Sequence, residues 1–227
     1  MTAGAQQETS LADSSQTGER DLIRRIRAGE KDLFHALLRP YERSMYSVIH
    51  SILPNPADIE EVAQEAAFKA YLHLDQLADE EKFKAWLLRI AVNEAQTRRR
   101  RDRPQLYDAL EGDAAEESEG DFRPRQFADW RDWPSDSLDR EELRTAVRDA
   151  VAKLPEKYRV VFVLADVESL SYEQIAAMLA LSVANVKTRL HRARMKLQES
   201  LNPAFRPRMT DHLSLLKGMN PWSRARR

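Results

Sequence analysis

Apolar residues recur at intervals of three and four along two long stretches of the chain, which is the spacing of one face of an α-helix. In the first stretch the pattern covers Leu37, Leu38, Tyr41, Met45, Ile49 and Ile52, then Ile59, Val62, Ala63, Ala66 and Ala70, then Phe83, Leu87, Ile90 and Ala91. In the second it covers Leu143, Val147, Ala150, Val151 and Leu154, then Val183, Val186, Leu190, Ala193 and Leu197. No sustained alternation of apolar and polar residues, the mark of a strand, interrupts either stretch. The pattern predicts an all-α protein without a β-sheet.

Glycine and proline divide the predicted helices into two small domains. The chain has only six glycines, and the stretches 30–111 and 121–217 contain all but a few of the periodic apolar positions and no glycine. We predict a disordered N-terminus over residues 1–18, a helical domain over 19–103 and a second over 138–201. Residues 104–137 are acidic and lack a sustained period, so they are expected to form a flexible linker. The pattern assigns no role to the basic tail, residues 202–227.

The charge distribution is more informative than its sum of −1. One basic block comprises Arg98 to Arg101 and Arg103, and another comprises Lys187, Arg189, Arg192, Arg194 and Lys196. An acidic linker between two basic blocks suggests a nucleic-acid partner. The chain has no cysteine, which excludes disulfides, cysteine-ligated zinc and a thiol nucleophile and fits a cytoplasmic protein.

The end of the second domain has the pattern of a helix-turn-helix. Ser171 and Gln174 form a capping-box signature for a short helix that ends near Leu179, and Ser182 can cap the next. Ala180 stands in the turn where glycine is common, at a cost of about 1 kcal/mol if its backbone is left-handed. With the apolar face packed inward, the outer face of the last helix would enter a DNA major groove. The candidate DNA-binding residues are Ser182, Lys187, Thr188, Arg189, His191, Arg192, Arg194 and Lys196. Of these, Arg189, Arg194 and Lys196 are expected where phosphates pass. The alternative is a solvated basic helix of an ordinary bundle.

A second candidate site joins aromatic residues to the first basic block. Bases of unpaired DNA stack on aromatic rings while arginines follow the backbone. The candidates are Phe83, Trp86, Arg89, Asn93, Arg98, Arg99, Arg100 and Arg101. The alternative for Phe83 and Trp86 is that both belong to the core.

A third candidate is an acidic face on the helix that begins after Pro56. Asp58, Glu61, Gln64 and Glu65 share this helix with an apolar stripe. Composition alone favours an ordinary solvated face.

Three motifs resemble the RNA polymerase sigma factors of the sigma-70 family, extracytoplasmic-function (ECF) class. The segment Ala57–Phe68 is similar to the polymerase-clamp-binding helix of sigma region 2, and Phe83–Asn93 to the adjoining segment that melts and recognises the −10 element. Leu154–Arg159, Leu170–Ala176 and Ser182–Arg194 are similar to region 4, which recognises the −35 element. The resemblance extends over residues 21–201 in the family's order, and no large block separates the two domains.

The resemblance implies a subunit that binds core RNA polymerase and directs promoter-specific initiation. Asp58, Glu61, Gln64 and Glu65 would then contact the β′ clamp. The other expected partners are the β flap, promoter DNA and an anti-sigma factor. Two alternatives stay open: a sigma-like decoy that titrates an anti-sigma factor, and a plain helix-turn-helix regulator. The basic residues argue against the decoy, and the first domain argues against the plain regulator.

Catalysis finds no support in the sequence. The five histidines are scattered without metal-ligand spacing, and a glycine-rich phosphate loop cannot form in glycine-free domains. We therefore expect no enzymatic activity, cofactor, metal or small-molecule substrate. No apolar run approaches the roughly 20 residues of a membrane-spanning helix, so no membrane insertion is expected.

Overall fold

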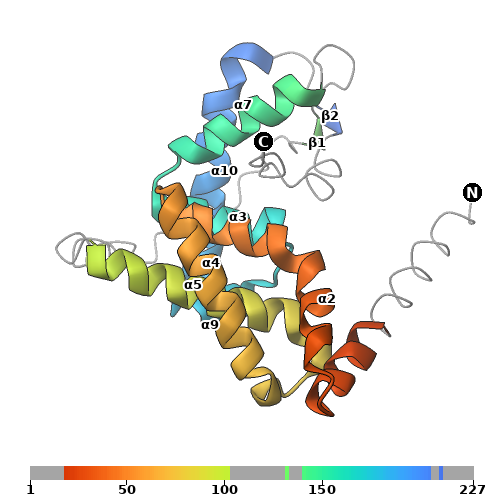
Figure 1. Ribbon diagram of the computed structural model, residues 1–227. Coiled ribbons are helices and arrows are strands. Elements are labelled where there is room, and N and C mark those ends of the chain that lie inside the picture. Colours follow the sequence, from red (N-terminus) through yellow and green to blue (C-terminus); the bar gives the residue numbers. More distant parts are fainter. Residues whose placement is uncertain (1–17, 103–130, 133–139, 206–209, 212–227) are drawn as a thin grey trace, which may run out of the picture.

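A computed structural model describes residues 18–102, 131–132, 140–205 and 210–211 of the chain (Figure 1). The acidic linker, apart from residues 131–132, and the first 17 residues lie outside the described residues, as does most of the tail. Apart from the turns and loops between elements, the described residues are helical except for one antiparallel ladder of two residue pairs, in which β1 (Arg131–Asp132) pairs with β2 (Thr210–Asp211). The ladder comprises only four of the described residues, so the prediction of an all-α fold is confirmed.

The first helical unit is built around α5 (Phe83–Asp102), which packs against α3 (Glu42–Ile52) and α4 (Pro56–Leu72). A helix over residues 18–27 and α2 (Phe34–Leu38) lie at its lower end in Figure 1. Short 3-10 turns join them: η1 (Lys31–Leu33), η2 (Arg39–Tyr41), η3 (Leu74–Gln76) and η4 (Glu80–Lys82). Helix α4 starts where the Asn55 side chain accepts a hydrogen bond from the Ala57 amide (3.1 Å), and Pro56 takes the first helical position.

The second helical unit places α10 (Val183–Phe205) against three shorter helices. These are α7 (Arg140–Lys153), α8 (Glu156–Phe162) and α9 (Tyr172–Leu179), and the π-helical turn η5 (Val163–Val167) continues α8. The predicted capping box is present: Ser171 Oγ accepts from the Gln174 amide (3.2 Å), and Gln174 Oε1 accepts from the Ser171 amide (2.8 Å). Helix α10 runs past the predicted domain end at residue 201 and includes Pro203.

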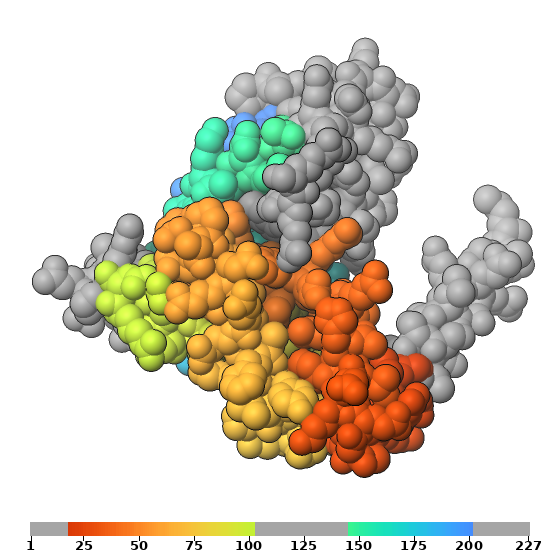
Figure 2. Space-filling model, viewed as in Figure 1, coloured from red at the N-terminus to blue at the C-terminus, as the bar shows by residue number. Residues whose placement is uncertain are grey.

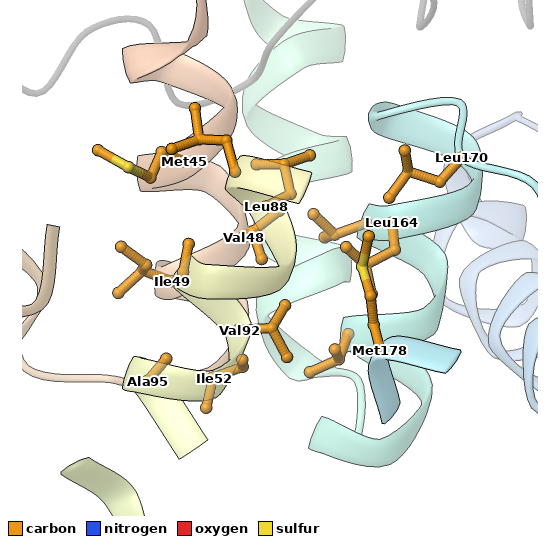
Figure 3. Close-up of a cluster of buried hydrophobic side chains, with 14 of the residues drawn as sticks. Met45, Val48, Ile49, Ile52, Leu88, Val92, Ala95, Leu164, Leu170 and Met178 are labelled. Atoms are coloured by element: carbon orange, nitrogen blue, oxygen red, sulfur yellow. The ribbon is translucent and has the colours of Figure 1, made fainter. Parts of the chain in front are cut away.

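The two units pack directly on one another. Helix α3 contacts α8 and η5, and α5 contacts α9. Figure 3 shows Val48, Leu88 and Val92 of the first unit in one buried cluster with Leu164 and Met178 of the second. On the face shown in Figure 2, the surface of α7 borders that of the first unit. The periodicity of the sequence predicted the helices but not this junction.

Ala180, at the C-terminal end of α9, has the left-handed backbone that its position in the turn suggested (φ 53°, ψ 42°). Its neighbour in the turn, Leu181, donates its amide to the Ala176 carbonyl (3.0 Å) and so closes the helix end. An L-residue with a Cβ is strained there, whereas glycine is not.

Ala180→Gly should raise the free energy of unfolding by about 0.5–1 kcal/mol, because relief of left-handed strain exceeds the added freedom of the unfolded chain. Ala177→Gly, on the exposed face of α9, is the matched control and should lower stability by a similar amount. Urea denaturation measures both. Equal destabilisation by the two glycines would contradict the strain at Ala180.

Candidate functional site

The acidic face of α4 points outward and is tied to α5 by one arginine. Glu61, Gln64 and Glu65 are exposed, while Asp58 is mostly buried beneath Arg98. The Arg98 guanidinium donates to Asp58 Oδ1 (2.5 Å) and to Glu61 Oε1 (3.1 Å). The hydrogen bond to Asp58 raises the pKa of Arg98, and the charges of Asp58 and Glu61 act in the same direction. Two groups of residues that the sequence presented separately are therefore joined in space.

Two large apolar side chains on α4 extend this face. Phe68 and Leu72 are 60% and 53% exposed, and they follow Glu61 and Glu65 at helical spacing on the same side of the helix. Sequence analysis missed them as site residues. They could have been recognised from the sequence, because both are large apolar residues that fall outside the buried stripe of the same helix, Ile59, Val62, Ala63, Ala66 and Ala70. Exposed large apolar residues beside carboxylates are typical of a protein-binding surface.

The aromatic residues at the start of α5 are packed into the first unit. Phe83 has no exposed surface, and its ring centre lies 5.5 Å from that of Tyr41 and 6.0 Å from that of Trp86. Trp86 is half-buried. Phe83 is therefore a core residue in this conformation. Of the two predicted stacking residues, only Trp86 is accessible to a base. Arg89 and Asn93, one turn apart, are exposed on the outer side of α5.

The four arginines at the end of α5 do not act as one patch. Arg98 faces α4, as described above. Arg99 forms an ion pair with Glu156 of the second unit. Arg100 and Arg101 are exposed, and only they continue the outer side of the helix as a basic surface.

Helix α10 presents part of its predicted face to solvent. Ser182 Oγ accepts from the Asn185 amide (3.1 Å) and so fixes the helix start. Lys187, Arg192 and Lys196 are exposed, and Lys187 Nζ lies 5.9 Å from the centre of the Tyr172 ring. Thr188 Oγ1 donates to the Ala184 carbonyl (3.0 Å).

Three predicted residues of α10 are less accessible than expected. Arg189 is 9% exposed, because its position falls on the inner side of the helix. Arg194 donates to both oxygens of Asp166 (2.9 and 2.6 Å). Burial alone would lower the pKa of Arg194, but hydrogen bonds and charge from Asp166 raise it above its usual value. His191 is half-buried, and this burial is the main cause of its lowered pKa. The nearby charges of Arg194 and Arg192 lower the pKa further. Arg189 is thus buried and Arg194 is already paired with Asp166, so neither side chain is open to a DNA phosphate as predicted.

Within residues 18–102 and 145–201, no group of three or more His, Asp or Glu side chains is arranged to hold a metal ion. None of the described helices is long and apolar enough to cross a membrane.

Comparison with known proteins assigns both helical units. The family "Sigma-70 region 2" matches residues 37–105, and "Sigma-70, region 4" matches residues 144–197. The chain is 34% identical over 179 residues to the ECF RNA polymerase sigma factor SigW of Bacillus subtilis, covering 79% of this chain and 94% of that protein. It is 32% identical over 197 residues to the ECF RNA polymerase sigma-E factor of Escherichia coli K12, covering 85% and 99%.

Two solved structures are similar in fold. CnrH in complex with the cytosolic domain of CnrY has a TM-score of 0.52 at 25% identity, covering 82% of this chain and 98% of that one. The sigma factor RpoE from Bartonella quintana, in complex with the anti-sigma factor NepR, has a TM-score of 0.54 at 24% identity, covering 75% and 98%. The second likeness supports the fold alone.

The Asp166–Arg194 pair is expected to hold α10 against η5. Asp166→Asn keeps the shape but removes the charge, and should lower the free energy of unfolding by about 1.5–3 kcal/mol, the range for hydrogen bonds to charged groups. Asp149→Asn, on the exposed side of α7, is the control and should change it by less than about 0.5 kcal/mol. Thermal or urea denaturation gives both values. Equal stability of the two variants would show that the pair does not anchor α10.

Proposed function

The chain belongs to the ECF class of the sigma-70 family of RNA polymerase sigma factors, and on that premise we propose which surfaces perform each step of initiation. It is a transcription initiation factor whose two helical units match sigma regions 2 and 4. We assign polymerase binding to α4, −10 recognition to the outer side of α5 and −35 recognition to α10. One observation carries the assignment: each family-matched unit presents a polar face that its own packing leaves exposed.

Polymerase binding is assigned to the α4 surface, defined as Glu61, Gln64, Glu65, Phe68 and Leu72. Carboxylates attract a basic partner at long range, and desolvated apolar side chains supply affinity once contact is made. Phe68 and Leu72 contribute little to folding because they are exposed. Asp58 supports this surface indirectly, since it is mostly buried and holds Arg98.

Promoter recognition is assigned to α5 and α10. Lys187 is exposed near the start of α10 and Arg192 in its middle, where a recognition helix in the major groove contacts base edges. Lys196 is exposed one turn further on, where phosphates are expected. On α5 the exposed stripe Arg89, Asn93 and Arg100 would follow the unpaired strand, with Trp86 as its stacking partner.

Regulation by a protein partner and the cellular setting complete the proposal. Two proteins of similar fold were solved with protein partners, and one of them, the sigma factor RpoE from Bartonella quintana, was solved with an anti-sigma factor. We infer an anti-sigma partner for this chain. The exposed basic residues of α10 support promoter binding over a decoy role, since a decoy has no use for them. We propose that the chain works in the cytoplasm as a non-catalytic subunit without a cofactor.

Initiation in a purified system tests the function as a whole. Core polymerase supplemented with this chain should produce transcripts from a promoter recovered from cells by occupancy mapping. Core polymerase alone should produce none from that promoter. A chain that binds core polymerase but starts no transcript at any occupied site would contradict the proposal.

Charge reversal at Glu61 and Glu65 should abolish co-purification with core polymerase while the helical content is kept. Phe68→Ala with Leu72→Ala should weaken binding as well, by about 2 kcal/mol or more if both are central contacts. The control is Asp75→Lys with Glu81→Lys, which makes the same charge change at exposed positions of the same unit. If the control pair and the α4 pair lose binding equally, only net charge matters and the α4 assignment fails.

Arg192→Ala should weaken binding to promoter duplex by about 1–3 kcal/mol and relax discrimination at one base pair of the −35 element. Lys196→Ala should weaken binding to all sequences alike. It should also reduce the slope of log affinity against log salt concentration by about one, because one fewer counterion is released. Fluorescence anisotropy with a panel of singly substituted −35 duplexes, at several salt concentrations, distinguishes these patterns. If both variants lose the same affinity for every duplex in the panel, Arg192 does not contact a base edge.

A further inference from the structure

We propose that the first helix of the described chain, residues 18–27, fixes the position of Trp86 for the −10 strand, with Arg27 as the main positioning residue. This helix (red in Figure 1) lies before residue 37, where the match to sigma region 2 begins. It belongs to none of the surfaces assigned to polymerase or DNA. The inference rests on the proposed assignment of the outer side of α5 to the −10 element. Arg27 acts through the α4–α5 loop, residues 73–82.

Three arginines on one side of the first helix reach the α4–α5 loop. Arg20, Arg24 and Arg27 follow one another at intervals of four and three residues, so they share a helix face. Arg20 pairs with Glu81, and Arg24 Nε lies 3.1 Å from Glu80 Oε2. The Arg24 side chain is 69% exposed and that of Glu81 is 60% exposed, and ion pairs with so much exposure contribute little. These two pairs alone therefore do not fix the loop.

Arg27 makes the contacts that hold the backbone of the loop. Its Nη2 donates to the carbonyls of Leu74 (3.0 Å) and Leu77 (2.5 Å), and both hydrogen bonds are partly buried. Its Nη1 lies 3.5 Å from Glu80 Oε1. A planar guanidinium presents several donors in a fixed fork, whereas the ammonium of lysine is a single point charge. Arginine is therefore suited to hold two carbonyls and a carboxylate at the same time.

The loop that Arg27 holds leads directly into α5. Asp79 Oδ1 accepts a hydrogen bond from the Glu81 amide (3.0 Å), and Asp79 Oδ2 lies 2.9 Å from Lys82 Nζ. These contacts shape the turn η4, after which α5 begins at Phe83. Trp86 lies in the first turn of α5. The position of the loop therefore sets the position of Trp86.

A second route from the first helix reaches Trp86 through packed rings. The Tyr41 hydroxyl donates a hydrogen bond to Glu19 of the first helix. Burial is the main cause of a raised pKa for Tyr41, and the hydrogen bond to Glu19 raises the pKa further, so the hydroxyl remains a donor. The Tyr41 ring packs edge-on against Phe83, with ring centres 5.5 Å apart, and the ring centres of Phe83 and Trp86 are 6.0 Å apart. The first helix thus supports Trp86 through both the backbone and the neighbouring ring.

A ring that is already in place binds an unpaired base more tightly than a mobile one. A side chain held in its bound position loses no further freedom when the ligand arrives. Trp86 is half-buried, so its supports decide where the remaining surface of the ring lies. Loss of the Arg27 contacts should therefore weaken binding of the unpaired −10 strand. It should leave −35 binding unchanged, because α10 belongs to the other unit.

Arg27→Met tests the inference in the holoenzyme, because it keeps an unbranched side chain and removes the guanidinium. Holoenzyme made with this variant should bind a fork-junction DNA with a single-stranded −10 extension about threefold to tenfold more weakly than wild-type holoenzyme, the range for ordering one side chain. Loss of the stacked base itself should cost more, about 5-fold to 150-fold. Binding to a duplex that carries only the −35 element should not change. Fluorescence anisotropy of labelled DNA measures both affinities.

Arg25→Met is the matched control on the same helix. Arg25 is exposed and pairs with Asp21 and Glu30, both close to it in sequence, so this variant should bind both DNAs as the wild type does. Arg27→Lys keeps the charge without the fork, and it should recover only part of the lost affinity. As the milder change, Arg27→Lys keeps the test available if Arg27→Met does not fold, which circular dichroism shows.

A double-mutant cycle with Trp86→Ala separates positioning from general stabilisation of the unit. If Arg27 acts through Trp86, Arg27→Met should have little further effect on fork-junction binding once Trp86 is alanine. The loss for the double variant should then stay close to that for Trp86→Ala alone. A residue that only stabilises the unit would give a loss that adds to that of Trp86→Ala.

The outcomes distinguish this inference from the proposed function. If Trp86→Ala binds the fork junction as tightly as the wild type, the assignment of Trp86 to the −10 strand fails, and the role of Arg27 fails with it. If Trp86→Ala weakens binding but Arg27→Met does not, the positioning role is wrong and the proposed function stands. The same holds if the two losses add, or if Arg27→Met weakens binding to the −35 duplex equally.

Discussion

Helix α5 buries six side chains along its length, and the packing of the rest of the chain follows from the need to cover them. Phe83, Leu87, Leu88, Ala91, Val92 and Ala95 are all fully buried. These positions extend around more than one side of the helix, so a single neighbouring helix cannot cover them. Helices α3 and α4 cover part of this surface, and the second unit covers Leu88 and Val92. The side of α5 that no neighbour covers is a narrow stripe, and Arg89 and Asn93 lie on it.

The same constraint explains why a run of four arginines does not behave as one basic patch. Consecutive helical residues point about 100° apart, so Arg98, Arg99 and Arg100 face α4, the second unit and solvent in turn. Each of the first two meets carboxylates: Arg98 meets Asp58 and Glu61, and Arg99 meets Glu156. One helix consequently links the proposed polymerase-binding surface, the proposed DNA-binding stripe and the junction between units. A change at Arg98 or Arg99 should be interpreted as a change in packing as well as in charge.

The proposed recognition surfaces and the junction between the units lie on different sides of the same two helical units. The exposed residues of α4 and α10 stay accessible while the units are packed together, because neither surface takes part in the junction. The contacts of Lys84, Glu156, Arg159 and Glu168 instead depend on the relative placement of the units.

The sequence by itself determined the local structure and the family. Helical periodicity, the capping box at Ser171 and the break at Pro56 predicted where helices begin because these signals act within a few residues. The resemblance of three motifs identified regions 2 and 4. The tertiary structure alone decided which basic residues are accessible. It placed Arg189 and Phe83 inside, paired Arg194 with Asp166 over 28 positions and joined Lys84 to Glu168 over 84. Such contacts depend on how helices pack, and the spacing of residues along one helix does not specify the neighbour that each side will meet.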